Sequence, residues 1–116
     1  MVSPVPAEVA LARLTPEERA WVVDFRDRLR AMLGDRVRDL RLFGSKVRGD
    51  FHDESDIDIL VLLDESDHTT GMAIARLAYE ISPVLAPVSF TFERYHRPAN
   101  RASGFYKAMR KESVRL

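Results

Sequence analysis

Apolar residues recur along this chain with two spacings, one typical of helices and one typical of strands. The firmest helical pattern lies in the first third, with apolar residues at Trp21, Val22, Phe25, Leu29, Met32 and Leu33. Thr15 stands directly before this segment, Pro16 opens it, and Glu18 follows three residues after Thr15. This arrangement is typical of a helix N-terminus with a capping box. We expect the helix to end at Gly34, because glycine readily adopts the conformation that terminates a helix.

Three shorter segments have the character of β-strands. In residues 37–43, Leu40 and Leu42 fall on one face, which indicates a strand with one buried side. Residues 56–63 end in an uninterrupted apolar run, which predicts a central strand that is covered on both faces. A third strand is expected over residues 87–93, where apolar and polar residues alternate.

The remaining segments predict further helices and loops. A second helix is indicated by apolar residues at helical spacing, namely Met72, Ile74, Leu77, Ala78 and Ile81. Pro83 prevents this helix from continuing far past Ser82. We expect loops at residues 64–70 and 94–101, and a short helix at residues 105–111. Together with the strands, this order predicts an α+β fold, a small mixed β-sheet with helices packed on it.

Length and composition agree with a single soluble domain. The chain has 116 residues, of which 46% are hydrophobic and 31% are charged. We interpret residues 15–116 as one domain and residues 1–14 as an N-terminal extension with a short helix at residues 7–14. The absence of cysteine excludes disulfides and thiolate metal sites. Because the longest apolar run is residues 59–63 and no signal peptide is evident, we expect a cytoplasmic protein without a membrane span.

The charge is balanced over the whole chain but not along it. The 18 basic and 18 acidic residues cancel, yet residues 93–116 hold seven basic residues and only two acidic ones. Such a segment could contact a nucleic acid or the phosphates of a substrate, or it could be the solvated surface of a helix. No recognisable nucleic-acid-reading motif accompanies it, so a nucleic-acid partner is not expected.

The candidate chemistry lies between the first two predicted strands. Gly44 and Ser45 follow the first strand, and a Gly-Ser turn lets backbone N–H groups and a hydroxyl approach a phosphate closely. Arg48 lies three residues later and could reach the same phosphates. Asp56 and Asp58 begin the second strand, where residues two apart point to the same side. Such carboxylates bind Mg²⁺ together with substrate phosphates, so the segment predicts metal-dependent chemistry on a nucleoside triphosphate.

This motif resembles the signature of a known enzyme superfamily. The Gly-Ser turn, ten intervening residues and then Asp56-x-Asp58 are similar to the pattern of the nucleotidyltransferases related to DNA polymerase beta. Arg48-Gly49 and Ser55-Asp56-Ile57-Asp58 resemble the small prokaryotic branch of that superfamily, and the closing segment 103–112 is loosely similar to the end of other small members. This branch comprises the minimal nucleotidyltransferases, or MntA-like antitoxins.

The resemblance implies an Mg²⁺-dependent transfer of a nucleoside monophosphate, most simply AMP from ATP. By this resemblance Gly44, Ser45 and Arg48 bind the nucleotide, and Asp56 and Asp58 are catalytic and hold two Mg²⁺ ions. Minimal family members are typically paired with a separately encoded HEPN-domain protein, a toxin that is silenced by AMPylation of a tyrosine. A HEPN-domain protein is therefore the expected partner, and its tyrosine is the expected acceptor.

One part of the family pattern is missing from this sequence. Relatives supply a third carboxylate from a later strand in a Pro-Val-Asp context, where this chain reads Pro87-Val88-Ser89. Glu93 is expected on the same strand face as Ser89, roughly 13 Å further along, and is a candidate metal ligand in its place. Two functions therefore stay open, a nucleotidyltransferase of reduced activity or a degenerate member that neutralises a HEPN-domain partner by binding alone.

Overall fold

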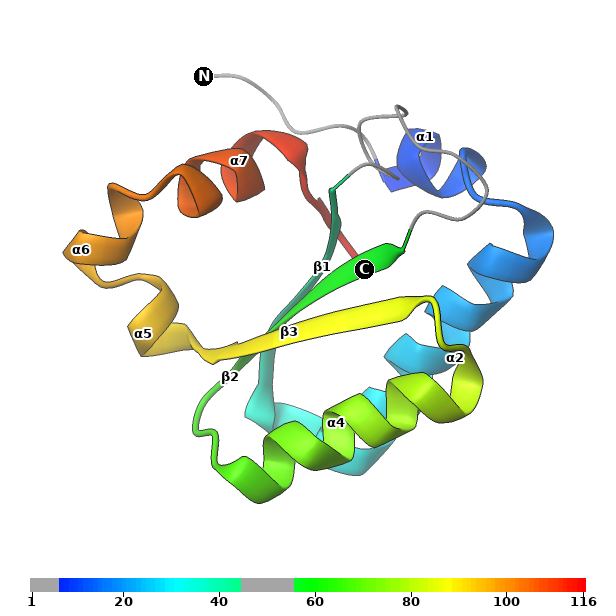
Figure 1. Ribbon diagram of the computed structural model, residues 1–116, viewed down its shortest axis with the longest axis horizontal. Helices are drawn as coiled ribbons and strands as arrows, with labels where there is room; N and C mark the ends of the chain where they lie inside the picture. The colour runs from blue at the N-terminus through cyan, green and yellow to red at the C-terminus, as the bar shows by residue number, and fades with distance from the viewer. Residues whose placement is uncertain (1–6, 45–55) are drawn as a thin grey trace.

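The computed structural model describes residues 7–44 and 56–116, which form a four-stranded sheet with helices on both faces (Figure 1). The strands are β1 (Val37–Phe43), β2 (Ile57–Leu63), β3 (Leu85–Thr91) and β4 (Val114–Arg115). The helices are α1 (Ala7–Ala12), α2 (Pro16–Leu33), the short 3₁₀ helix η1 (Gly34–Arg36), α4 (His68–Ile81), α5 (Phe92–Tyr95), α6 (Pro98–Arg101) and α7 (Gly104–Glu112). The expected α+β class, a mixed sheet with packed helices, is confirmed.

The sheet has the strand order β3-β2-β1-β4, so β1 and β2 are the two inner strands. β1 runs antiparallel to both β2 and β4, while β2 and β3 are parallel and are joined through α4. Phe43 pairs with Asp58, which places the end of β1 and the start of β2 at the same edge of the sheet. The predicted central position of the second strand is confirmed, and nearly all of its residues are buried.

One face of the sheet, here called the α2/α4 face, is covered by α2 and α4 with a continuous hydrophobic core. Alternate residues of β2 point into this core, and their side chains are fully buried: Ile57, Ile59, Val61 and Leu63. Phe25 from α2 and Ile74 from α4 pack against the same core. This layer therefore holds the two inner strands in place.

The opposite face, here called the α7 face, is covered by the C-terminal helices. Leu60 and Leu62 of β2 point to this side and form a small buried cluster with Tyr95 of α5 and Met109 of α7. Figure 1 shows α5, α6 and α7 in succession along this side of the sheet. The chain then returns to the sheet as β4, which pairs with β1.

The sequence signals at the ends of the first long helix are confirmed by the geometry. The hydroxyl oxygen of Thr15 accepts a hydrogen bond from the N–H of Glu18 at 3.1 Å. In return, Oε1 of Glu18 accepts one from the N–H of Thr15 at 2.9 Å, which completes the capping box. Gly34 ends the helix with a φ of 54°, a left-handed conformation that glycine adopts readily.

The predicted bounds of the third strand are wrong by two residues at each end. The strand spans Leu85–Thr91 instead of residues 87–93. It stops there because the hydroxyl of Thr91 accepts a hydrogen bond from the N–H of Arg94 at 3.1 Å and so caps α5. Glu93 consequently lies in a helix and not on a strand.

Two expected loops are also shorter than predicted. Within residues 64–70, α4 already begins at His68, because the carboxylate of Asp67 accepts a hydrogen bond from the N–H of Thr70 at 2.7 Å. Within residues 94–101, a turn of helix forms from Pro98, a residue well suited to the start of a helix. Among the helices of the described residues, none is long and apolar enough to cross a membrane.

Candidate functional site

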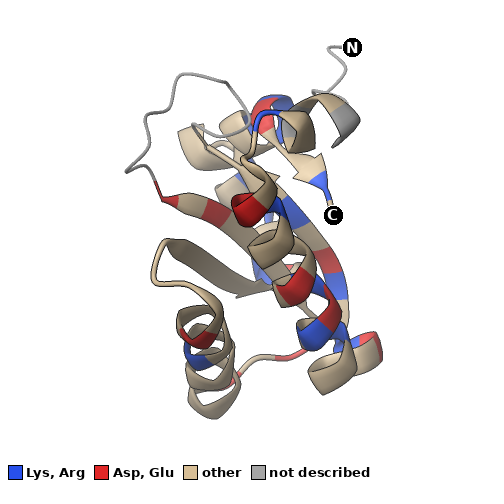
Figure 2. Cartoon of the chain, turned by 90° about the vertical axis from the view of Figure 1, so that its right-hand side faces the viewer, with Lys and Arg blue, Asp and Glu red and all other residues tan. Residues whose placement is uncertain are grey.

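The predicted site lies at the edge of the sheet where β1 ends and β2 begins. Gly44 follows β1 directly, and Asp58 is the second residue of β2. The two strands stay paired up to this edge, with Phe43 opposite Asp58. Figure 2 shows acidic positions at the start of β2. Ser45 and Arg48, the other two predicted nucleotide-binding residues, lie outside the described residues.

Gly44 approaches the side chain of Asp58 so closely that a larger residue at this position would require that side chain to move. Its φ of 84° lies in the left-handed region that L side chains rarely adopt. A Cβ atom added to Gly44 would overlap Oδ2 of Asp58 and would lie 3.3 Å from its Cγ. The start of the predicted phosphate-binding turn and one carboxylate of the motif therefore lie side by side.

Asp56 and Asp58 point to the same side of the sheet but differ in exposure. Asp56 directly precedes β2 and is exposed, whereas Asp58 is half-buried. Ile57 between them is fully buried on the α2/α4 face. Because side chains of an extended chain alternate, both carboxylates are directed to the α7 face. A ligand can therefore reach them without entering the hydrophobic core.

A cavity of about 320 Å³ lies beside Asp58 on the α7 face. Its lining combines the sheet edge with side chains of α7, and it comprises Phe43, Gly44, Asp58, Phe105, Ala108, Met109 and Glu112. We call it the Asp58 cavity. Its walls are mainly apolar, and its two carboxylates come from different parts of the chain.

Glu112 is the residue of this cavity that sequence reasoning missed. It is the last residue of α7, and β4 begins two residues later. β4 pairs with β1 through Val114 and Leu42, which brings the end of α7 level with Gly44. Pairing between segments so far apart in the chain cannot be recognised from the spacing of neighbouring residues. The only available signal was an acidic residue within a strongly basic segment.

β3 does not bring a third carboxylate to the Asp58 cavity. Ala86, and not Ser89, is the residue paired with Asp58 in the parallel register. Ser89 is paired with Val61, whose side chain belongs to the core of the α2/α4 face. Because paired residues on neighbouring strands point to the same face, Ser89 lies on the opposite face from Asp58. A carboxylate at position 89 would therefore point away from the two aspartates.

Glu93 does not replace the missing carboxylate, and the prediction that placed it on a strand beside the site is wrong. Its side chain is 83% exposed, and its Oε1 lies 3.6 Å from Nη2 of Arg97 in the next turn. β3 ends at Thr91, which pairs with Leu63, roughly 16 Å along β2 from Asp58. Glu93 is therefore at the far end of the sheet from the aspartates.

The donors at this edge fit an ion that takes only part of its ligands from the protein. Within residues 7–44 and 56–116, no three Asp, Glu, His or Cys side chains are grouped so that they could hold a metal ion. Asp56 and Asp58 supply two carboxylates on one side of the chain. Mg²⁺ retains several waters and is usually bound through one or two carboxylates together with substrate phosphates. The two aspartates are therefore a sufficient donor set for Mg²⁺ with a bound triphosphate.

Comparisons with known proteins agree with this geometry. The sequence pattern of the family described as Nucleotidyltransferase domain matches residues 22–104. The fold is similar to the crystal structure of a candidate nucleotidyltransferase from Sulfolobus solfataricus, with 20% sequence identity and a TM-score of 0.50. This similarity covers 94% of the present chain and 84% of the other one. No curated protein sequence matches the chain.

Proposed function

Because the chain belongs to the nucleotidyltransferase domain family, whose members transfer a nucleoside monophosphate, we propose that it moves AMP from Mg²⁺-ATP to a hydroxyl acceptor. The observation that carries this proposal is the close approach of Gly44 to Asp58 at the edge where β1 ends and β2 begins. The proposed acceptor is a tyrosine of a HEPN-domain partner, as the resemblance to the minimal nucleotidyltransferases implies.

The proposed reaction assigns different parts of the nucleotide to the two strands. The backbone at Gly44 would approach the phosphate oxygens, and Asp56 and Asp58 would hold the divalent cation. A bound cation supplies charge neutralisation at the phosphates and at the pyrophosphate leaving group. The acceptor oxygen forms a bond to the α-phosphorus, the bond to the β-phosphate oxygen breaks, and the hydroxyl proton leaves to solvent. Because Asp58 lines a cavity on the α7 face, the reacting phosphate would lie on that face.

A second candidate function is favoured by the residues of β3. The strand presents Ala86, Val88 and Phe90 on the face of Asp58, and none of them carries a carboxylate. A general base contributes on the order of 10²–10⁴-fold to rate, so a site without one could bind Mg²⁺-ATP with little transfer. The alternative is therefore a degenerate family member that neutralises its partner by binding alone.

Transfer of labelled phosphate separates the two candidates. The protein is incubated with Mg²⁺ and with ATP labelled at either the α- or the γ-phosphate, together with its co-expressed HEPN-domain partner. The enzyme function predicts that the α-label and not the γ-label appears on the partner. Substitution of Asp56→Asn with Asp58→Asn is expected to lower this transfer by at least about 100-fold, because both metal ligands lose their charge.

The matched control is Glu93→Gln, which removes a carboxylate at the far end of the sheet. This variant is expected to transfer label at the rate of the wild-type protein. Equal transfer by the wild-type protein and the double variant would contradict the proposed enzyme. A double variant that transfers nothing but still neutralises the partner completely would establish the second candidate.

A further inference from the structure

A second and larger cavity adjoins the Asp58 cavity on the α7 face. It has a volume of about 510 Å³ and lies between α7 and the part of β1 that points to this face. Asp39 and Arg41 of β1 line it, as do Tyr106 and Met109 of α7. Met109 lines both cavities, so the two cavities are neighbours on this face. We call the larger one the basic cavity.

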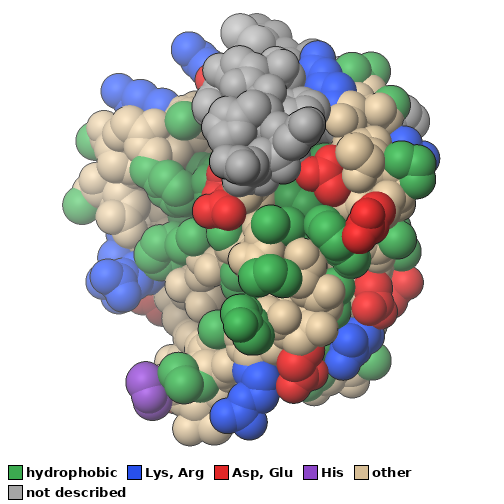
Figure 3. Space-filling view, turned by 45° about the vertical axis from the view of Figure 1, so that its right-hand side comes forward, with side chains coloured by type: hydrophobic (Ala, Val, Ile, Leu, Met, Phe, Trp, Pro, Cys, Tyr) green, Lys and Arg blue, Asp and Glu red, His purple; other side chains and the backbone are tan. Residues whose placement is uncertain are grey.

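Three cations of α7 stand at the rim of the basic cavity, namely Lys107, Arg110 and Lys111. All three are exposed, and their spacing of three and four positions places them on one side of the helix. Their side chains form no ion pair within the part of the chain that the structure describes. On the face shown in Figure 3, by contrast, basic and acidic side chains lie next to one another in the lower part of the view. The rim is therefore a concentration of available positive charge.

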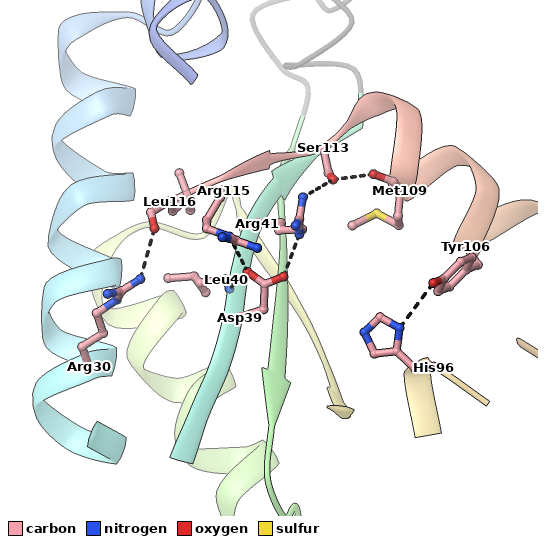
Figure 4. A network of polar contacts seen from close by, with 10 residues as sticks. All are labelled: Arg30, Asp39, Leu40, Arg41, His96, Tyr106, Met109, Ser113, Arg115 and Leu116. Atoms are coloured by element: carbon pink, nitrogen blue, oxygen red, sulfur yellow. Dashed lines mark hydrogen bonds and ion pairs between the residues drawn. The ribbon is translucent and has the colours of Figure 1, made fainter. Parts of the chain in front are cut away.

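The one acidic group in this lining is already neutralised. Oδ2 of Asp39 accepts a hydrogen bond from Nε of Arg41 at 2.8 Å, and its Oδ1 lies 3.3 Å from Nε of Arg115 (Figure 4). Arg41 also donates through Nη1 to the hydroxyl of Ser113 at 3.2 Å, and this hydroxyl donates to the carbonyl of Met109. The floor is thus a connected polar network, and the uncompensated charge of the cavity comes from the three cations of α7.

The inner wall of the basic cavity is aromatic. The ring of Tyr95 lies 5.0 Å from the rings of both His96 and Tyr106, measured between centroids. Nδ1 of His96 and the hydroxyl of Tyr106 are 3.3 Å apart. Burial, together with the nearby charge of Arg101, lowers the pKa of His96, so its ring is mainly neutral at pH 7. A wall of this kind suits a flat ring with a polar tip.

We propose that the basic cavity binds an acidic segment of the protein that receives the nucleotide, an inference that rests on the proposed function. The available cations of α7 complement carboxylates on such a segment, and the aromatic wall accommodates the ring of an acceptor tyrosine. The shared lining at Met109 brings that tyrosine to the edge of the Asp58 cavity. A phosphate group would meet the same cations but would leave the aromatic wall uncovered, so a segment that carries both carboxylates and an aromatic ring is the better match.

Binding of a defined acidic peptide tests this proposal. A fluorescein-labelled peptide of sequence Glu-Glu-Tyr-Glu-Glu is titrated with the full-length protein, and binding is followed by fluorescence anisotropy at low salt. The variant with Lys107→Glu, Arg110→Glu and Lys111→Glu is expected to bind at least about tenfold more weakly. A second variant with Lys107→Gln and Lys111→Gln removes two charges without introducing repulsion within α7. Its affinity for the peptide is expected to lie between those of the wild-type protein and the charge-reversed variant. The matched control is Arg76→Glu, an exposed charge on α4 that is expected to change nothing.

The location of the peptide is read from histidine signals in NMR spectra of the same complex. His96 lines the basic cavity, and its ring resonances are expected to shift when the peptide is added. His68 is exposed at the start of α4, and its resonances are expected to stay in place. This internal comparison distinguishes binding in the cavity from general attraction to a charged surface.

Several outcomes overturn the inference. The first is equal affinity of the wild-type protein and the charge-reversed variant for the peptide. The second is a shift of the ring resonances of His68 instead of those of His96. The third is complete displacement of the peptide by inorganic pyrophosphate at equal concentration. Binding of Mg²⁺-ATP to the wild-type protein is measured in parallel and reports on the proposed function alone. A protein that binds Mg²⁺-ATP but not the peptide contradicts this inference and leaves the proposed function standing.

Discussion

The two faces of the sheet are organised in opposite ways. On the α2/α4 face, side chains of β2 such as Ile59 and Val61 are completely buried beneath two long helices. On the α7 face, the buried cluster is much smaller, and the half-buried carboxylates of Asp39 and Asp58 each line a cavity. The closed face accounts for the stability of the sheet, and the open face presents its polar groups to ligands.

The same strand serves both purposes because its side chains alternate. In β2, Ile57 and Ile59 fix the backbone in the core, while Asp58 between them points to the open face. A carboxylate buried inside the core would cost several kcal/mol unless it were paired. Placing it on the second face keeps it rigidly positioned yet accessible. Substitutions on the two faces should therefore have separable effects on stability and on ligand binding.

The largest expected effect is on stability, from a substitution on the closed face. Phe25 is fully buried in the core between α2 and the sheet. Phe25→Ala is expected to lower the free energy of unfolding by about 3–5 kcal/mol, because it removes a large buried ring and leaves a cavity. Urea denaturation measures the change. The control on the open face is Phe105→Ala, which removes a ring that is 40% exposed and should cost much less. Equal losses would contradict the contrast between the faces.

A pair of glycine substitutions comes next in size. Gly44→Ala places a side chain at a φ of 84° and against Asp58, so it is expected to destabilise the fold by about 1–2 kcal/mol and to weaken Mg²⁺-ATP binding. Gly71→Ala is the control, because no atom lies within 4 Å of the new Cβ and the residue is inside α4. The control should stabilise the protein by up to about 1 kcal/mol. Thermal unfolding and calorimetric titration with Mg²⁺-ATP measure both effects.

The register of β3 predicts which position could restore a third carboxylate. Ala86 is paired with Asp58 on the open face, whereas Ser89 is paired with Val61 on the closed face. Ala86→Asp is expected to increase AMP transfer by about tenfold or more, within the range of an added general base. Ser89→Asp should leave transfer unchanged and lower the melting temperature. Higher AMP transfer by the Ser89→Asp variant than by the Ala86→Asp variant would contradict the conclusion that residue 86, and not residue 89, lies beside Asp58.

The smallest expected effect is a dependence of stability on pH that comes from the open face. Burial lowers the pKa of His96 below its usual value of 6.5, so the unfolded chain binds more protons than the folded one between these two pKa values. The free energy of unfolding is therefore expected to fall as the pH decreases through this window. Above pH 6.5 the neutral form of His96 causes no such loss. Urea denaturation at pH 7.5 and pH 5.5 measures the change, and His96→Gln should reduce it. A wild-type protein that gains stability on acidification relative to this variant would contradict the expectation.

Features encoded by neighbouring residues were predictable from the sequence. The capping box of Thr15 and Glu18, the stop at Gly34 and the central position of β2 all follow from local patterns, and the structure has each of them. The α+β class follows from the order of these elements. Met32 and Met72 are exceptions among the helical signals, since each belongs to a predicted apolar stripe but is exposed, at 45% and 53%.

Features that depend on pairing between distant segments were not predictable. The alignment placed Ser89 beside the aspartates, but the register of β2 with β3 puts it on the other face. Glu93 was expected on a strand, yet the cap at Thr91 turns the chain into α5. Glu112 enters the Asp58 cavity only because β4 pairs with β1. Ser89 and Glu112 are thus positioned by pairing between distant strands, which no local spacing reports, whereas Glu93 is displaced by a local cap at Thr91.

The central claim is that the aspartates at the open edge of β2 hold a metal-bound nucleotide. Isothermal titration calorimetry with ATP, in the presence of Mg²⁺ and then of EDTA, tests it most directly on the wild-type protein and on Asp58→Asn. We expect the wild-type protein to bind ATP only with Mg²⁺ and the variant to bind at least about tenfold more weakly, with an unchanged melting temperature. Equal affinity of the two proteins, or binding by the wild-type protein that is unaffected by EDTA, would contradict the claim.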